Sequence, residues 1–302
     1  MNKTNIIKFP KMGLEFAIDN VALRIFGIPI YWYGIIISTG FLLAILLGLK
    51  NCKKFGIKSE DVIDLVLWAA PMAIVGARLY YVIFQWDEFS GDIMSIINIR
   101  TGGLAIYGGL IGAVIGAVIF TRVRKINFFL IADLAAPYFV MAQAIGRWGN
   151  FVNQEAFGTN TSLPWGMHSK AVQDYLTWLG DSSVDPLMPV HPTFLYESIW
   201  NFAVFSFLIW HRKRYKVPGE LFFLYTALYG IGRAWIEGLR TDSLYIGGII
   251  RASQLLAIVS AIVFALVIFI RRKINSEVNP VYNIDIEPKK VDTTEKVDKR
   301  QK

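Results

Sequence analysis

Long apolar stretches separated by short polar connections dominate the chain. A helix needs about 20 mostly apolar residues to cross the hydrocarbon core of a bilayer, and its backbone must satisfy its own hydrogen bonds there. The pattern therefore predicts an all-α polytopic membrane protein with seven transmembrane helices. The stretches that meet or nearly meet this length are residues 31–49, 61–84, 104–121, 128–145, 193–210, 220–237 and 249–270.

Basic residues predict the orientation of these spans. Clusters of Lys and Arg follow every second stretch, at 50–58, 122–125, 212–216 and 271–273. Basic loops stay on the cytoplasmic side of a membrane. We therefore expect the N-terminus outside and the C-terminus in the cytoplasm. The longest connection, 146–192, is then extracytoplasmic.

The chain divides into two predicted parts. Residues 1–273 form one seven-helix transmembrane domain, whereas residues 274–302 are polar with little apolar periodicity. We interpret this second segment as a disordered cytoplasmic tail. In the third stretch, Gly108, Gly112 and Gly116 lie four residues apart, a stripe that lets two helices approach closely. A phosphate-binding loop would need a preceding strand and a following Lys-Ser/Thr pair, and the sequence has neither.

Composition agrees with this pattern. Of the 302 residues, 54% are hydrophobic and 18% are charged, against about 25% charged in typical soluble domains. These values exclude disordered and collagen-like chains. The net charge of +8 would suggest a nucleic-acid partner, but most of the basic residues belong to the loop clusters and the tail. We therefore expect membrane lipid, and no nucleic acid, as a partner.

Cys52 is the single cysteine of the chain. An internal disulfide and a cysteine-based metal cluster are therefore excluded. The lysines beside Cys52 could favour a reactive thiolate, but an inert loop cysteine is the more common case. We expect no metal site and no cofactor.

Candidate chemistry gathers where the fourth and sixth stretches end. Residues 146–158 read GRWGNFVNQEAFG, and the same loop ends in HPTFLYE at 191–197. In the sixth stretch, Arg233, Glu237 and Arg240 share one helical face. Charges inside a span are costly and usually functional. An Arg–Glu pair that only locks helices together is the structural alternative.

The residue types suggest an anionic ligand. A guanidinium is a fixed-charge fork that suits phosphate oxygens. Arg147, Arg233 and Arg240 could hold a phosphodiester at the outer membrane boundary, and Asn150 and Asn153 could donate to the same oxygens or orient a glycerol hydroxyl. The residues alone do not specify a reaction.

Residues 146–158 resemble the signature of the prolipoprotein diacylglyceryl transferase family. Companion motifs occur in the same order along the chain, and the resemblance extends over about residues 15–270, across all seven stretches. These companions are YWYG at 31–34, GAR at 76–78, GGLAIYGG at 102–109, HPTFLYE at 191–197 and YGIGR at 229–233.

The resemblance implies a membrane-bound transferase of the bacterial plasma membrane. Its implied reaction moves the diacylglyceryl group from phosphatidylglycerol to the lipobox cysteine of a prolipoprotein signal peptide, forming a thioether and releasing glycerol phosphate. No cofactor is implied, and the nucleophile belongs to the substrate. Arg147 matches the family's phosphatidylglycerol-binding arginine and Arg233 its second essential arginine. Further matching positions are Asn150, Glu155, Gly158, Tyr229 and Tyr33.

Tyr107 departs from the family pattern. Many relatives carry a histidine at this place, which has been assigned as a general base. A phenol with a reference pKa near 10 is a poor base at neutral pH. Either Tyr107 orients substrate, or another group or water takes the thiol proton. His191 is one such group, although a histidine before a helix-starting proline is more often structural.

Two other classes of protein compete with this interpretation. An anion or lipid transporter would need charges near the membrane midplane and repeat symmetry, whereas these arginines cluster near one face. A seven-helix receptor would need no shared polar signature at its outer mouth. Both alternatives explain less of the sequence than a transferase does.

Overall fold

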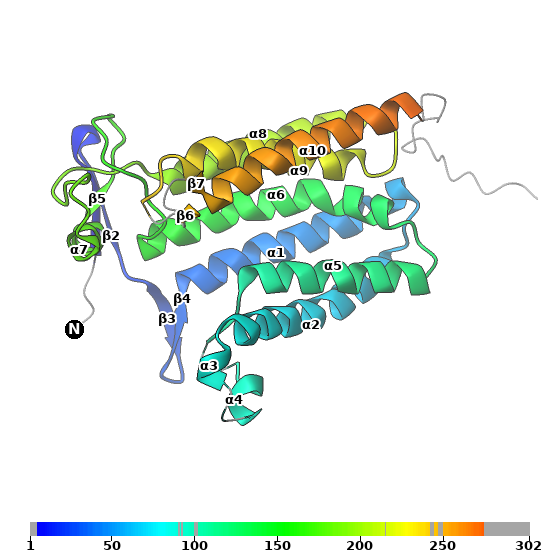
Figure 1. The fold of residues 1–302 in the computed structure, drawn as a ribbon, viewed down its shortest axis with the longest axis horizontal. Helices are drawn as coiled ribbons and strands as arrows, with labels where there is room; N and C mark the ends of the chain where they lie inside the picture. Colours follow the sequence, from blue (N-terminus) through cyan, green and yellow to red (C-terminus); the bar gives the residue numbers. More distant parts are fainter. Residues whose placement is uncertain are drawn as a thin grey trace, which may run out of the picture.

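Seven long helices run alongside one another and form the body of the molecule (Figure 1). The computed structural model describes residues 5–89, 91, 93–99, 102–214, 216–241, 245–246 and 250–274. The long helices follow the predicted stretches in order. They are α1 Trp32–Asn51, α2 Ser59–Phe84, α5 Ile106–Val123, α6 Phe128–Asn153, α8 Thr193–His211, α9 Glu220–Glu237 and α10 Ala252–Ile274.

Within the part of the chain that the structure describes, five helices are long and apolar enough to cross a membrane: α1 with the 3-10 turn that follows it, α2, α5, α6 and α10. Large apolar side chains on these helices, such as Leu67, Ile83 and Phe269, are mostly exposed, which is the arrangement that contact with lipid requires. The chain is therefore a mostly helical polytopic membrane protein. Beyond Ile274, the predicted tail lies outside the described residues.

The all-α prediction is wrong for the region before α1. Residues 5–31 form strands because short β-branched and aromatic runs are separated by tight turns at Gly13 and Gly27. The strands are β1 Asn5–Phe9, β2 Leu14–Ile18, β3 Val21–Ile25 and β4 Ile28–Tyr31. A short strand from the long loop, β5 His168–Ser169, joins the first sheet in the order β2-β1-β5. Near α10, β6 Tyr245–Ile246 pairs with β7 Ile250–Arg251.

A small domain, which we call the head, covers one end of the bundle. It consists of β1, β2 and the connection 154–192, which includes β5 and α7 Lys170–Leu179. Apolar side chains from β1, the end of α6 and α7 form its core, among them Ile7, Phe151, Val172 and Leu176. Figure 1 shows the head at one end of the long helices.

Helix α6 lies at the centre of the bundle, between α1, α8 and α9. It continues through Asn153, so the first part of the predicted loop is helical. At the other end of α6, Asp133 is fully buried and accepts hydrogen bonds from the backbone N–H groups of Gly219 (2.6 Å) and Phe222 (2.9 Å). This carboxylate caps the beginning of α9 and fixes it against α6.

The predicted glycine stripe is a helix contact. A Cβ placed on Gly108 would lie 2.3 Å from the carbonyl oxygen of Gly76, and one on Gly112 would lie 2.2 Å from that of Met72. Both distances are far below van der Waals contact, so α2 and α5 approach each other backbone to backbone. Small α3 (Trp86–Phe89) and α4 (Ile93–Ile97) complete the connection between these two helices.

Gly112→Ala should destabilise the protein by forcing α2 and α5 apart. Overpacking of this kind costs about 1–3 kcal/mol, which corresponds to a thermal midpoint lower by about 2–10 °C. Tryptophan fluorescence during heating in detergent measures this midpoint. Gly48→Ala in α1 is the matched control, because a Cβ on Gly48 meets no atom within 4 Å. Equal midpoints for the two variants would contradict the close contact.

Candidate functional site

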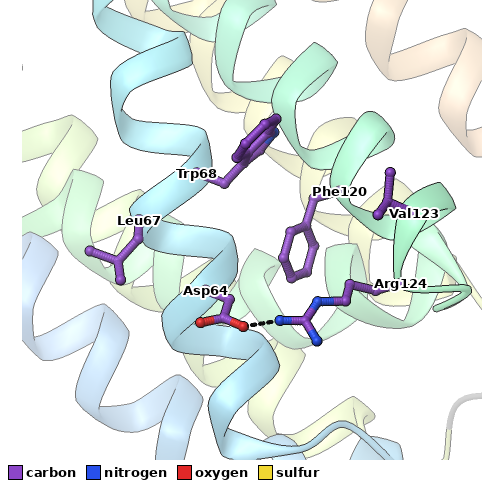
Figure 2. Close-up of a pocket in the computed structure, with 6 residues that line it drawn as sticks. All are labelled: Asp64, Leu67, Trp68, Phe120, Val123 and Arg124. Carbon is purple, nitrogen blue, oxygen red and sulfur yellow. Dashed lines mark hydrogen bonds and ion pairs between the residues drawn. The ribbon is translucent and has the colours of Figure 1, made fainter.

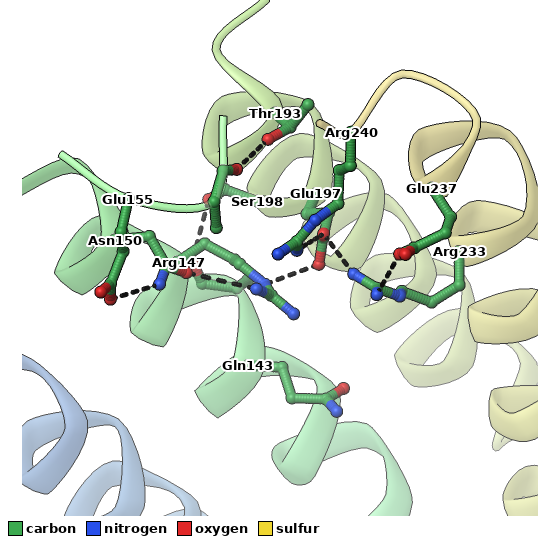
Figure 3. A network of polar contacts seen from close by, with 12 residues as sticks. Gln143, Arg147, Asn150, Glu155, Thr193, Glu197, Ser198, Arg233, Glu237 and Arg240 are labelled. Carbon is green, nitrogen blue, oxygen red and sulfur yellow. Dashed lines mark hydrogen bonds and ion pairs between the residues drawn. The ribbon is translucent and has the colours of Figure 1, made fainter. Parts of the chain in front are cut away.

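Glu197 is the centre of a charged cluster at the head end of the bundle (Figure 3). It lies near the beginning of α8 and is only 3% exposed. Its Oε2 lies 2.6 Å from Nε of Arg147 on α6, and its Oε1 lies 2.6 Å from a guanidinium nitrogen of Arg233 on α9. One carboxylate therefore joins three helices through two arginines.

The two arginines are held differently. Arg233 donates a hydrogen bond to Glu197 and also pairs with Glu237, one turn further along α9. By contrast, the contact of Arg147 with Glu197 Oε2 is an ion pair without hydrogen-bond geometry. Arg147 also donates to Asn150 Oδ1 at 3.2 Å. The guanidinium of Arg147 is therefore the less firmly fixed of the two.

A third arginine, Arg240, lies 3.8 Å from Glu197 Oε1. Three arginines thus lie around the carboxylates of Glu197 and Glu237. Because the cluster is largely buried, its charges are weakly screened, and its guanidinium groups are the groups to which an anion would bind.

Glu155 extends the cluster toward the head. Its Oε1 accepts hydrogen bonds from Asn150 (2.9 Å) and Asn153 (3.4 Å). The residues on either side, Gln154 and Ala156, have φ values of +55° and +56°. Left-handed backbone at two non-glycine residues is uncommon and costs free energy. Here it turns the chain back at the end of α6, so that Glu155 meets the last helical turns.

Gly158 is the point at which three segments meet. Its N–H donates to the carbonyl of His191 at 2.9 Å, and it forms an isolated bridge with Arg240. A Cβ on Gly158 would lie 2.8 Å from Cβ of His191 and 2.8 Å from the carbonyl oxygen of Leu239. The absence of a side chain therefore lets the segment that carries Arg240 approach the loop.

The predicted tyrosines lie in different places. Tyr33 packs over Gly149 near the end of α6, where a Cβ would lie 2.8 Å from its ring. Tyr229 lies one turn before Arg233, on α9. Tyr107, at the beginning of α5, is 56% exposed, and the described contacts include no hydrogen bond or ion pair between it and the cluster. The structure thus brings the predicted arginines, asparagines and Glu155 together but leaves Tyr107 apart.

Glu197 is the residue that sequence reasoning missed as a site residue. Its signal was an acidic residue in the first turns of a predicted span, where an unpaired charge is costly. Two further contributors come from beyond α9: Ser253 donates to Glu237 at 2.6 Å, and Arg251 donates to the backbone carbonyl of Glu237. The Arg233–Glu237 pair lies within α9, and the Arg–Glu pairs that join helices are those of Arg147 and Arg233 with Glu197.

Arg78, from one of the companion motifs, binds backbone carbonyl groups and has a structural role. It is buried and donates to the carbonyls of Ser95 (2.6 Å), Ile96 (2.8 Å), Gly102 (2.9 Å) and Gly103 (2.8 Å). This guanidinium therefore holds the connection that leads to α5 and Tyr107.

A separate cavity of about 370 Å³ lies between α2 and α5, at the end away from the head (Figure 2). An ion pair between Asp64 and Arg124 borders it, and its other walls are apolar. Both side chains of the pair are well exposed, and the cavity contains none of the residues of the charged cluster.

Comparison with known proteins identifies the chain's relatives. The family model for prolipoprotein diacylglyceryl transferase matches residues 20–270. This chain belongs to that family. A phosphatidylglycerol–prolipoprotein diacylglyceryl transferase of Bacillus mycoides (strain KBAB4) is 46% identical over 264 residues, covering 87% of this chain and 95% of the relative. The enzyme of the same name from Clostridioides difficile (strain 630) is 44% identical over 244 residues, covering 81% and 92%.

These comparisons confirm the family and the transferase class that the sequence motifs predicted. The match includes α1 to α9 and most of α10, so the charged cluster lies within the part of the chain shared with the diacylglyceryl transferases. The strands β1 and β2 lie before the region that the family model matches.

Glu197→Gln should destabilise this diacylglyceryl transferase family member, because two buried guanidinium groups would lose their shared counter-ion. Removing one partner of a buried ion pair costs about 3–5 kcal/mol. The thermal midpoint in detergent measures the loss. Glu15→Gln is the control: the Lys8–Glu15 pair at 2.8 Å is about half exposed, and such pairs contribute at most about 1 kcal/mol. A midpoint for Glu197→Gln as high as that of the control would contradict the central position of Glu197.

Proposed function

We propose that this protein transfers the diacylglyceryl group from phosphatidylglycerol to the lipobox cysteine thiol of a prolipoprotein signal peptide. The product is a thioether, and glycerol phosphate leaves; this is the first step of lipoprotein maturation. Family membership and the names of the relatives support the reaction. The observation that carries the proposal is the pair of arginines, from α6 and α9, that share the carboxylate of Glu197.

In the proposed reaction, the sulfur of the substrate cysteine attacks the carbon of the diacylglyceryl group that carries the phosphate ester, and the headgroup glycerol leaves with the phosphate. The C–S bond forms as the C–O bond breaks, and the phosphate oxygen takes the electron pair. Negative charge then grows on the leaving phosphate. Guanidinium groups placed in advance stabilise such charge without reorganisation.

Arg147 is suited to bind the lipid phosphate, since its contact with Glu197 lacks hydrogen-bond geometry and a phosphate can replace it. Arg233 remains paired with Glu197 and Glu237 and supplies a fixed positive charge. Asn150, Asn153 and Glu155 form a hydrogen-bonded group beside Arg147. We infer that this group orients the glycerol hydroxyls of the headgroup.

Four more predicted residues lie on elements around the cluster: Tyr33 on α1, Tyr229 on α9, and Gly158 and Arg240, which form a bridge with each other. Gly158 brings the segment of Arg240 close to the loop, and Arg240 adds to the positive charge around Glu197. Tyr33 and Tyr229 approach from α1 and α9. We propose that these four residues shape the site for phosphatidylglycerol.

The proton of the substrate thiol does not need a fixed base in this proposal. Tyr107 stands apart from the cluster. Burial lowers the pKa of His191 below its usual range, so its ring is neutral at pH 7, but its Nδ1 lies 3.1 Å from the hydroxyl of Tyr196. That contact favours a structural part for His191. Water or the departing phosphate can take the proton.

We also propose that all seven long helices cross the bacterial plasma membrane, with the N-terminus outside and the C-terminus in the cytoplasm. Helices α8 and α9 pair their charged side chains within the bundle: Glu197 with Arg147 and Arg233, and Glu237 with Arg233. At the end away from the head, Glu220 contacts His211 at 2.7 Å and pairs with Arg272. Arg124 and Arg212 lie at this same end, as basic residues on the cytoplasmic side would.

Arg147→Ala should lower the transfer rate at least about 100-fold, because loss of one charge-stabilising donor typically has that effect. The assay follows phosphatidylglycerol labelled in its acyl chains onto a lipobox peptide, with the purified protein in lipid. Arg124→Ala, at the opposite end of the bundle, should keep its activity. Circular dichroism shows whether each variant is folded. Near-normal transfer by a folded Arg147→Ala variant would remove Arg147 from the mechanism.

Tyr107→Phe should retain most of the transfer activity. A general base contributes about 10²–10⁴-fold to a rate, and Tyr107 is exposed outside the cluster. The same labelled-lipid assay, run beside Tyr107→His, measures the difference. A loss of about 100-fold in the Phe variant that is restored in the His variant would show that proton transfer at this position is essential after all.

A further inference from the structure

The β3–β4 hairpin carries an aromatic side chain at a turn that does not favour one. Ile25 pairs with Ile28 across a two-residue turn, in which Phe26 and Gly27 have φ values of +48° and +82°. Turns with two positive φ values favour Asn, Asp or Gly at the first position. Phe26 instead is strained there and 99% exposed. Its ring therefore does not stabilise the hairpin through contacts within the described protein.

One face of the hairpin is apolar along its length. Leu23 pairs with Ile30 and Ile25 with Ile28, and residues directly opposite each other share a face of the ladder. Ile28 is 68% exposed, and Leu23 and Ile25 are about half exposed. Isolated two-stranded hairpins are marginally stable in water. An apolar face of this kind indicates a binding surface.

The opposite face has a different character. Arg24 pairs with Pro29 and lies on the other side of the ladder from the isoleucines. Arg24 is exposed. The hairpin is therefore amphipathic, with a cation on one face and an apolar surface on the other. Amphipathic elements with a basic polar face are typical of segments that lie in the interface of a membrane.

The position of the hairpin places this apolar face beside lipid. β4 ends at Tyr31 and α1, a candidate membrane span, begins at Trp32. Aromatic residues at such a boundary lie at the level of the lipid headgroups. Figure 1 shows the hairpin extending from the beginning of α1 across the direction of the long helices, away from the head. It is thus continuous with the membrane-facing surface of the bundle.

We propose that the β3–β4 hairpin inserts its apolar face and the ring of Phe26 into the leaflet on the head side of the membrane. Arg24, on the other face, lies among the lipid phosphates. The occupant of the surface is the phospholipid bilayer, because the span that follows fixes the hairpin at its boundary. The proposal concerns binding to lipid and does not rest on the transferase reaction.

Phe26→Cys, labelled with the environment-sensitive fluorophore NBD, tests the insertion. Cys52 is fully buried, and the unlabelled parent protein, treated in the same way, measures its background reaction. The full-length protein is placed in nanodiscs of phosphatidylglycerol and phosphatidylcholine, one copy in each. Trp178→Cys is the matched control, since Trp178 is 79% exposed on α7 of the head.

The label at position 26 should emit at shorter wavelength than the label at position 178. Spin-labelled lipids in the disc should quench it strongly, and aqueous iodide should quench it several-fold less than it quenches position 178. Ile28→Cys, on the same face, should behave like position 26 and serves if Phe26→Cys does not fold.

Three results would overturn the proposal. Iodide quenching at position 26 equal to that at position 178 would place the ring in water. Shielding that arises only when a lipobox peptide is added would assign the surface to the peptide. Shielding that arises only in larger discs with two copies would assign it to a second molecule of this chain.

Discussion

The carboxylate of Glu197 is the contact on which the functional end of the bundle depends. Arg147 and Arg233 come from different helices, and both guanidinium groups are largely buried. Without the shared carboxylate, two like charges would face each other in a poorly screened environment. Burial of an unpaired charge is strongly unfavourable. Glu197 thus fixes the relative positions of α6, α8 and α9 where the substrate is proposed to bind.

In the proposed mechanism, the same contact lets the site respond to an anion. A phosphate that approaches Arg147 competes with a carboxylate already in place, so binding exchanges one anionic partner for another. Arg233 keeps a second carboxylate, that of Glu237, and need not move. The site therefore combines one guanidinium that can change partner with another that is fixed. This proposed division of roles suits the charge that develops on a leaving phosphate.

The sequence predicted the helices and the local motifs well, because both depend on residues that are close together along the chain. Hydrophobic length located the seven long helices, and the spacing of Gly108 and Gly112 predicted the close contact of α2 with α5. The position of Glu197 at the centre of the charged cluster could not be predicted from such local patterns. Its partners lie 50 residues before it and 36 residues after it, and only packing of the helices brings them together. The strands before α1 were missed because they are short and precede the first long apolar stretch.

The strands that the sequence analysis did not predict help to hold the candidate site in place. β1 pairs with β2 on one side and with β5 on the other, so a strand from the start of the chain holds the middle of the connection that begins at Gln154. The near part of that connection carries Glu155 between two left-handed residues, a conformation that persists only when its surroundings hold it. Thr193, at the start of α8, donates to the carbonyl of Ala156. Strand β1 therefore holds this connection at β5 and Thr193 of α8 holds it at Ala156, and the contact at Ala156 supports the strained turn that keeps Glu155 against Asn150.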